Sequence, residues 1–268
     1  MQKVLFMILL AAAALLGGCS ADTPTQAAST ADDAVASMVA VTLGHESMGL
    51  SAVVTDLITA GRGRALRRAT DATSISQLVV TRNDSIAEPL TRSQLYQLAC
   101  ERQSANNYSS WQIEYALRFS QLGGGSETVP FAGPRSADVA VSGTFRNGLL
   151  TARGDAHGTI NFDGASAGDE RSMRGEYRWE GEATVSNTRY DNVAITLSWN
   201  RLRLPDHPTG AAGFLRGHCD VTVRAMGPDG VISRNGDVEY TGDGNAIVSV
   251  GGRRYLVDVH AGETVRGL

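Results

Sequence analysis

The stretch Trp111–Ser120, WQIEYALRFS, decides the fold class of this chain. Every second residue is apolar, and polar or small residues stand between them. The apolar positions are Trp111, Ile113, Tyr115, Leu117 and Phe119. A period of two is typical of a strand that buries one face and exposes the other. We therefore expect a half-buried strand here.

The same alternation recurs toward the C-terminus. It is found in VAVSGTF (139–145), EYRWEGEATV (176–185), NVAITLSW (192–199), CDVTVRA (219–225), VISRNGDVEY (231–240) and AIVSVGGRRYLVDV (246–259). Asn147-Gly148 and Gly251-Gly252 predict hairpin turns. Since no crossover helices separate these segments, antiparallel pairing is favoured. The expected fold is mainly β, an antiparallel sandwich or a curved meander sheet of about nine strands, with short N-terminal helices.

Helical spacing is found only before residue 104. Apolar residues recur three and four positions apart between 32 and 60, and Gly44 and Gly49 interrupt the pattern. This predicts two short helices or a broken one. Pro89, followed by Leu95 and Leu98 at helical spacing, predicts a further helix at 91–103.

The N-terminus has the pattern of an export signal. Lys3 precedes the apolar run Val4–Leu16, which is too short to span a bilayer comfortably. Leu16-Gly17-Gly18-Cys19 resembles the lipobox of bacterial lipoproteins. The resemblance implies that 1–18 is a signal peptide and that the Cys19 thiol carries diacylglycerol. Acyl chains at Cys19 would make the membrane a partner of the chain.

The residues after Cys19 refine this expectation. In the lipoprotein class, serine at position 20 resembles a signal for export to the outer membrane, with the protein facing the periplasm; another envelope membrane is the alternative. Residues 19–33 are rich in Ala, Thr, Ser and Asp, which is typical of a flexible tether. Residues 34–268 are then expected to form a single β-rich domain.

Cys100 and Cys219 remain once Cys19 is lipidated. Disulfides persist in the oxidising cell envelope, so we expect these two residues to be bonded, the alternative being two buried free thiols. The chain carries 24 basic and 28 acidic residues, for a formal net charge of -4. This mild acidity argues against nucleic acid as a partner.

Two motifs contain residue types that occur in catalytic or metal sites. Gly164–Gly168 matches the G-x-S-x-G nucleophile pattern around Ser166, but no apolar helix follows it, so a loop between strands is the favoured interpretation. His218-Cys219-Asp220 contains three residue types that bind metal ions. The other histidines stand singly in the sequence, so no metal and no cofactor is expected.

Two further residue sets allow a binding role. The first, Arg62, Arg64, Arg67 and Arg68, could contact lipid headgroups, although a solvated segment is the simpler interpretation. The second consists of aromatic residues that belong to the core or line a groove for an apolar ligand. It comprises Trp111, Tyr115, Phe119, Tyr177, Trp179 and Trp199.

From these features we expect a lipid-anchored envelope lipoprotein with a non-catalytic binding or assembly-support role in the periplasm. Its partner would be an envelope protein or a lipid. The alternatives are a carrier or sensor of an apolar ligand held by the aromatic residues, and a serine hydrolase that uses Ser166.

Overall fold

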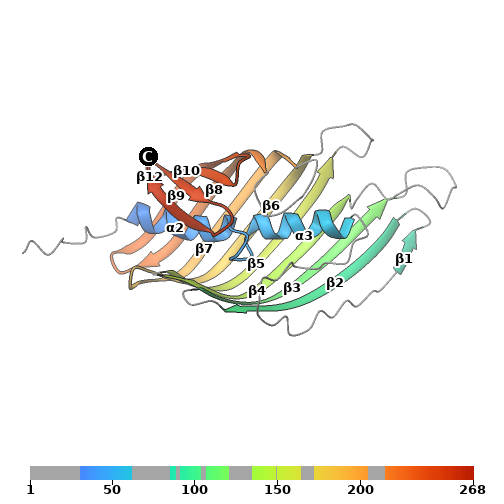
Figure 1. Ribbon diagram of the computed structural model, residues 1–268, viewed down its shortest axis with the longest axis horizontal. Coiled ribbons are helices and arrows are strands. Elements are labelled where there is room, and N and C mark those ends of the chain that lie inside the picture. The colour runs from blue at the N-terminus through green and yellow to red at the C-terminus, as the bar shows by residue number, and fades with distance from the viewer. Residues whose placement is uncertain are drawn as a thin grey trace, which may run out of the picture. The chain divides into compact units, whose positions relative to one another are not determined.

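The strands pair in the order in which they follow one another along the chain. In the computed structural model (Figure 1) they form one 12-stranded antiparallel meander that curves around two helices. The structure describes residues 31–61, 85–88, 91–103, 107–120, 135–148, 150–163, 172–204 and 215–268. The predicted fold class is confirmed, and the form adopted is the curved meander.

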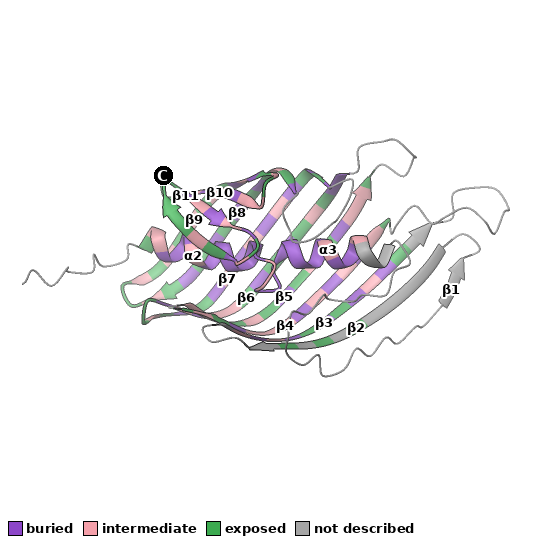
Figure 2. Cartoon of the chain, in the orientation of Figure 1, coloured by how far each residue is buried: buried purple, intermediate pink, exposed green. Residues whose placement is uncertain are grey.

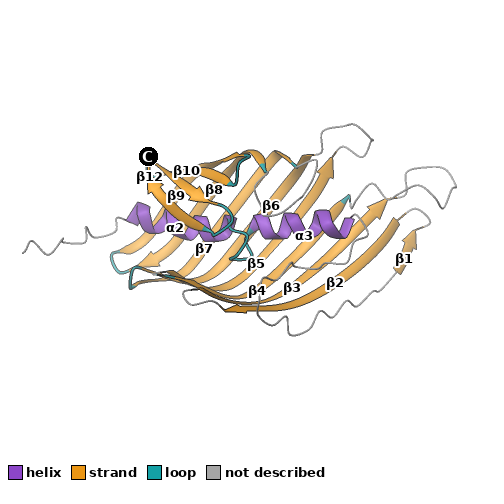
Figure 3. Ribbon diagram, viewed as in Figure 1, coloured by secondary structure: helices purple, strands orange, loops and turns teal. Residues whose placement is uncertain are grey.

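The helices are α2 (Ala31–Leu43) and α3 (Leu50–Gly61). The strands are β1 (Ser85–Glu88), β2 (Thr91–Gln103), β3 (Asn107–Ser120), β4 (Ser136–Asn147), β5 (Leu150–Asp163), β6 (Ser172–Val185), β7 (Thr188–Arg203), β8 (Arg216–Gly227), β9 (Gly230–Thr241), β10 (Asn245–Val250), β11 (Arg253–Asp258) and β12 (Glu263–Gly267). Figure 3 shows how strongly strands dominate the described chain. Strands β3, β4 and β6 to β11 correspond to the alternating segments, β5 lies between two of them, and β1, β2 and β12 extend the sheet at its two edges.

The helix predicted at 91–103 is wrong, because this segment is strand β2. It pairs with β3 over its whole length, from Thr91 opposite Ser120 to Gln103 opposite Tyr108. Helical spacing of a few leucines is a weak local signal, and the backbone hydrogen bonds offered by the long neighbouring strand override it. A period of two is also present here, since Gln97, Ala99 and Glu101 are all exposed.

Helices α2 and α3 are apolar on nearly every side, which explains their position. Residues from Ala34 to Leu43 are buried except Ser37, and Leu50, Val53 and Leu57 of α3 are buried as well. A helix that is hydrophobic all round must lie inside the protein. Both helices lie against the same face of the sheet, called here the helix face (Figure 1). The break between them includes Gly44 and Gly49, as predicted.

The start of α2 is fastened to the sheet. Helix α2 begins at Ala31, so it includes the last three residues of the expected tether. Arg234 of β9 donates from Nε to Asp32 Oδ1 at 2.7 Å, and the Tyr255 hydroxyl of β11 donates to Asp33 Oδ1 at 2.8 Å. Carboxylates in the first helical turn are also favoured by the helix dipole. Asp32 and Asp33 thus belong to the folded domain rather than to a tether.

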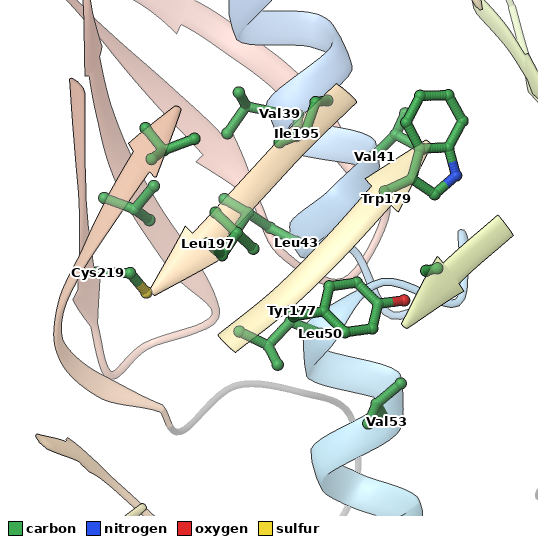
Figure 4. Close-up of a cluster of buried hydrophobic side chains, with 14 of the residues drawn as sticks. Val39, Val41, Leu43, Leu50, Val53, Tyr177, Trp179, Ile195, Leu197 and Cys219 are labelled. Carbon is green, nitrogen blue, oxygen red and sulfur yellow. The ribbon is translucent and has the colours of Figure 1, made fainter. Parts of the chain in front are cut away.

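The core lies between the helices and the helix face of the sheet. Figure 2 shows buried residues alternating with exposed ones along the strands, while the helices are buried over most of their length. Side chains from α2, α3, β6, β7 and β8 meet in one cluster (Figure 4). Leu43, Leu57, Ile195 and Leu197 are all fully buried.

A row of glycines crosses the helix face. Gly143 of β4, Gly154 of β5 and Gly181 of β6 are consecutive cross-strand partners. A Cβ atom built on Gly154 would lie 2.1 Å from the carbonyl oxygen of Glu180, and one on Gly181 would lie 2.1 Å from that of Arg153. The backbones of β5 and β6 therefore approach too closely for any side chain in this row.

Alkaline pH is expected to destabilise the fold. Burial raises the pKa of Tyr177 and of Tyr240 above the ordinary 10.0, and burial followed by the charge of Asp229 raises that of Tyr190. A tyrosine whose pKa is higher in the folded state stabilises the fold below its unfolded pKa and loses that contribution as the pH rises. Urea unfolding from pH 8 to pH 11 should therefore give a free energy of unfolding that declines above about pH 10. A constant value across this range would contradict the buried state of these hydroxyls.

Candidate functional site

The helix face carries the predicted aromatic residues, and the two helices cover it. Trp111, Tyr115, Tyr177, Trp179 and Trp199 are between 0% and 6% exposed. The Tyr115 hydroxyl donates to Asp56 Oδ2 in α3 at 2.7 Å, and the Tyr177 hydroxyl donates to the backbone carbonyl of Met48 at 3.1 Å. These aromatics are core residues, and the side chain of Phe119 lies outside the described residues. The surface that stays open is the opposite face of the sheet, called here the outer face.

Two adjoining hollows lie on the outer face over β2 to β6. Their volumes are about 500 and 470 Å³, and they share Glu114, Ala140 and His157. These three residues are successive cross-strand partners on β3, β4 and β5, so they form one line across the sheet. Small residues, among them Ala99, Ala140 and Gly158, line these hollows together with longer polar side chains. The outer hollows, as we call the pair, are the candidate site.

The outer hollows are rich in carboxylates. Glu114, Asp138, Asp155 and Glu176 line them, against one arginine, Arg178. Asp138 is paired with Arg118 at 2.8 Å and accepts a hydrogen bond from Thr159 at 3.1 Å. Arg178 is itself engaged, since its Nε donates to Glu180 at 3.0 Å.

Three polar side chains of the outer hollows stay open to a partner. Asp155, His157 and Glu176 are exposed, and within the described chain their side chains have no hydrogen-bond or ion-pair partner. An exposed acidic surface of this kind attracts cationic groups. The chemistry it offers is hydrogen bonding and ion pairing.

Ser142, Asp155 and His157 share one hollow, yet they do not form a catalytic triad in this structure. Within the described residues no hydrogen bond joins these side chains. Nucleophilic catalysis needs a base in reach of the hydroxyl and a third group that orients the base. His157 also stands on open sheet surface rather than in a pocket that excludes water.

The predicted disulfide between Cys100 and Cys219 is absent, because Cys219 is a free thiol. Cys100 lies in β2 and Cys219 in β8, with five strands of the meander between them. A disulfide requires the two Cα atoms to lie within about 7 Å. Adjacent strands of a sheet are already about 4.8 Å apart, so two residues with five strands between them are too far apart to bond. Cys219 is instead part of the core, where it is 2% exposed (Figure 4).

His218 and Asp220 do not join Cys219 in a site. Successive residues of a strand point to opposite faces, and both neighbours of Cys219 are exposed on the outer face. Within the described residues no group of three or more histidine, cysteine or acidic side chains is placed to hold a metal ion. Neither described helix has the length and apolar character that a membrane-spanning helix needs.

Native Cys219 is expected to resist alkylation. Burial, and secondly the charge of Asp220, raises the pKa of its thiol, and the thiolate is the reactive form. In a Cys100→Ser variant, iodoacetamide at pH 8 should modify residue 219 about a thousandfold more slowly in native protein than in urea, because modification requires opening of the core. Peptide mass spectrometry measures both rates. Equal rates, or a peptide of the unmodified chain that joins residues 100 and 219, would contradict this structure.

The remaining predicted site residues lie outside the described residues. They are Cys19, Arg62, Arg64, Arg67, Arg68 and Ser166. The outer hollows were not predicted as a site. The alternation of polar residues placed Glu114 and Glu176 on a polar face, but grouping them with Asp155 and His157 requires the pairing of four strands.

Comparison with protein families, with curated proteins and with solved structures finds no match to this chain.

Proposed function

We propose that the chain is a lipid-anchored lipoprotein of the cell envelope whose sheet domain binds a partner through the outer hollows, without catalysis. The anchor is Cys19, and the proposed location is the periplasmic side of the outer membrane. The observation that carries the binding role is the division of the sheet. The chain's own helices occupy one face, and the opposite face presents an acidic depression with unpaired side chains.

Charge selects the partner. Four carboxylates line the outer hollows, and the single arginine there is engaged by Glu180. Electrostatic complementarity favours a partner that presents arginine or lysine at this surface. We therefore propose an envelope protein with an exposed basic segment.

An apolar-ligand carrier is less well supported. The described aromatic residues that would form its groove, all of the set except Phe119, are almost completely buried on the face that the helices occupy. Access for a ligand would require a helix to leave the helix face. Extraction of lipid from the purified full chain, followed by mass spectrometry, separates the two functions, because only a carrier retains a stoichiometric apolar ligand.

The binding role is tested by photo-crosslinking in cells from a benzoylphenylalanine placed at position 157. The expected result is one adduct that disappears in the Asp155→Lys/Glu176→Lys variant, whose charges would repel a basic partner. Asp229→Lys/Asp237→Lys is the matched control, since it makes the same change in charge at two exposed positions, one in the β8–β9 turn and one on β9. The site is rejected if the adduct survives the charge reversal at positions 155 and 176, or if it is lost equally in the control.

The anchor is tested separately by labelling cells with tritiated palmitate. The chain should be labelled and fractionate with membranes, and Cys19→Ser should be unlabelled and keep its first 18 residues. An unlabelled unmodified chain would reject the anchor and leave the binding test unaffected.

A further inference from the structure

One residue shared by both outer hollows is a histidine. His157 is the one histidine among the described residues that line either hollow. Its side chain is exposed and has no hydrogen-bond or ion-pair partner within the described chain. A histidine side chain ordinarily gains its positive charge between about pH 8 and pH 5, whereas carboxylates ordinarily titrate near pH 4. His157 can therefore change the charge of the outer hollows in a range where the carboxylates stay ionised.

The nearest neighbours of His157 lie on β4, β5 and β6, since the helices cover the other face of the sheet. On β4 the residue directly opposite is Ala140, which carries no charge, and on β6 it is Arg178. Arg178 is ion-paired with Glu180, and its Nε donates to that carboxylate at 3.0 Å. On β5 itself, Asp155 precedes His157 by two residues on the same exposed face. The arginine beside His157 is thus already engaged by a carboxylate.

Further carboxylates surround the same position. Asp138 of β4 and Glu176 of β6 are the cross-strand partners of Thr159, which follows His157 by two residues on the same face. Glu114 of β3 lies one strand beyond β4, on the line that includes His157. The next arginines on these strands lie farther along the outer face and are Arg118, Arg153 and Arg174. A proton on the imidazole would therefore place a positive charge in acidic surroundings.

We propose that His157 makes binding at the outer hollows depend on pH, so that a basic partner is held at neutral pH and weakened by mild acid. Protonated His157 offsets the attraction of Asp155 and Glu176 for arginine or lysine, and it repels those groups directly. One unit charge at an exposed site changes an affinity by about threefold to tenfold. Because linkage is reciprocal, binding of the partner also favours loss of the proton. This inference rests on the proposed function and adds its regulation.

Fluorescence anisotropy of labelled hexaarginine amide, titrated with the purified full chain in a neutral detergent at constant ionic strength, tests the proposal. The dissociation constant at pH 5.5 should exceed that at pH 7.5 by about threefold to tenfold. In His157→Gln the two constants should agree within about twofold and lie near the pH 7.5 value of the unmodified chain. His157→Arg, whose charge is fixed, should bind weakly at both pH values.

His218→Gln is the matched control, because it removes a histidine of β8 that does not line the outer hollows, and it should keep the pH dependence. Equal constants at the two pH values in the unmodified chain, or full pH dependence in His157→Gln, overturn this inference and leave the proposed function standing. The proposed function fails as well if hexaarginine does not bind at pH 7.5, or if Asp155→Lys/Glu176→Lys leaves its binding unchanged.

Discussion

Val39→Asp should prevent the sheet from assembling around its helices. Val39 of α2 is fully buried, and most of the residues around it in the helix are buried too. A charge at this position would therefore have no contact with solvent. Leaving a carboxylate buried and unpaired costs several kcal/mol, out of a total stability of about 5–15 kcal/mol for a typical domain. The expected outcome is loss of soluble, cooperatively unfolding protein, measured by urea titration with circular dichroism.

Ala31→Asp is the control for this substitution, because it adds the same charge at an exposed position of the same helix. Leu43→Ala gives a graded version. It removes a fully buried side chain and should lower the free energy of unfolding by about 2–5 kcal/mol through the cavity it leaves. Val39→Asp protein with the unfolding midpoint of the unmodified chain would show that α2 does not lie in the core.

Gly154→Ala is expected to destabilise the fold by about 1–3 kcal/mol or more, as overpacked substitutions do. Replacing glycine by alanine usually stabilises a protein where the backbone conformation allows it. Here the new methyl group would meet the backbone carbonyl oxygen of Glu180 at 2.1 Å, so β5 and β6 must separate. The sign of the effect is therefore reversed, and chemical denaturation measures it.

Gly267→Ala provides the comparison, since no heavy atom lies within 4 Å of its added Cβ. Its free energy of unfolding should change by less than about 0.5 kcal/mol. Gly181→Ala, on the neighbouring strand of the same row, should behave like Gly154→Ala. A neutral Gly154→Ala would contradict the close approach of the two strands.

The sequence predicted only part of the candidate site. Alternation identified Glu114 and Glu176 as outward-facing, because the face a strand residue takes depends only on its parity. It did not show that they share the outer hollows with His157, which requires the register of β3 to β6. A bulge in β7 changes the parity within that strand, so alternation alone does not predict which face its last residues take.

Two predictions failed because neither took account of which segments the sheet brings together. The segment 91–103 was assigned from its own spacing, but its long pairing with β3 decides its structure. Cys100 and Cys219 were paired because they were the two cysteines left. The meander puts five strands between them and buries Cys219 in the core.

Local patterning therefore determined the fold class, the turns at Asn147-Gly148 and Gly251-Gly252, and the break between the two apolar helices. These properties depend on a few neighbouring residues, because the alternation of buried and exposed side chains is set by the local order of apolar and polar residues. Tertiary structure alone decided which strand residues stand side by side, where the glycine row brings two strands close together, and which face the helices cover. Those outcomes arise from backbone pairing and burial between segments far apart in the chain, whose free energies no single segment contains.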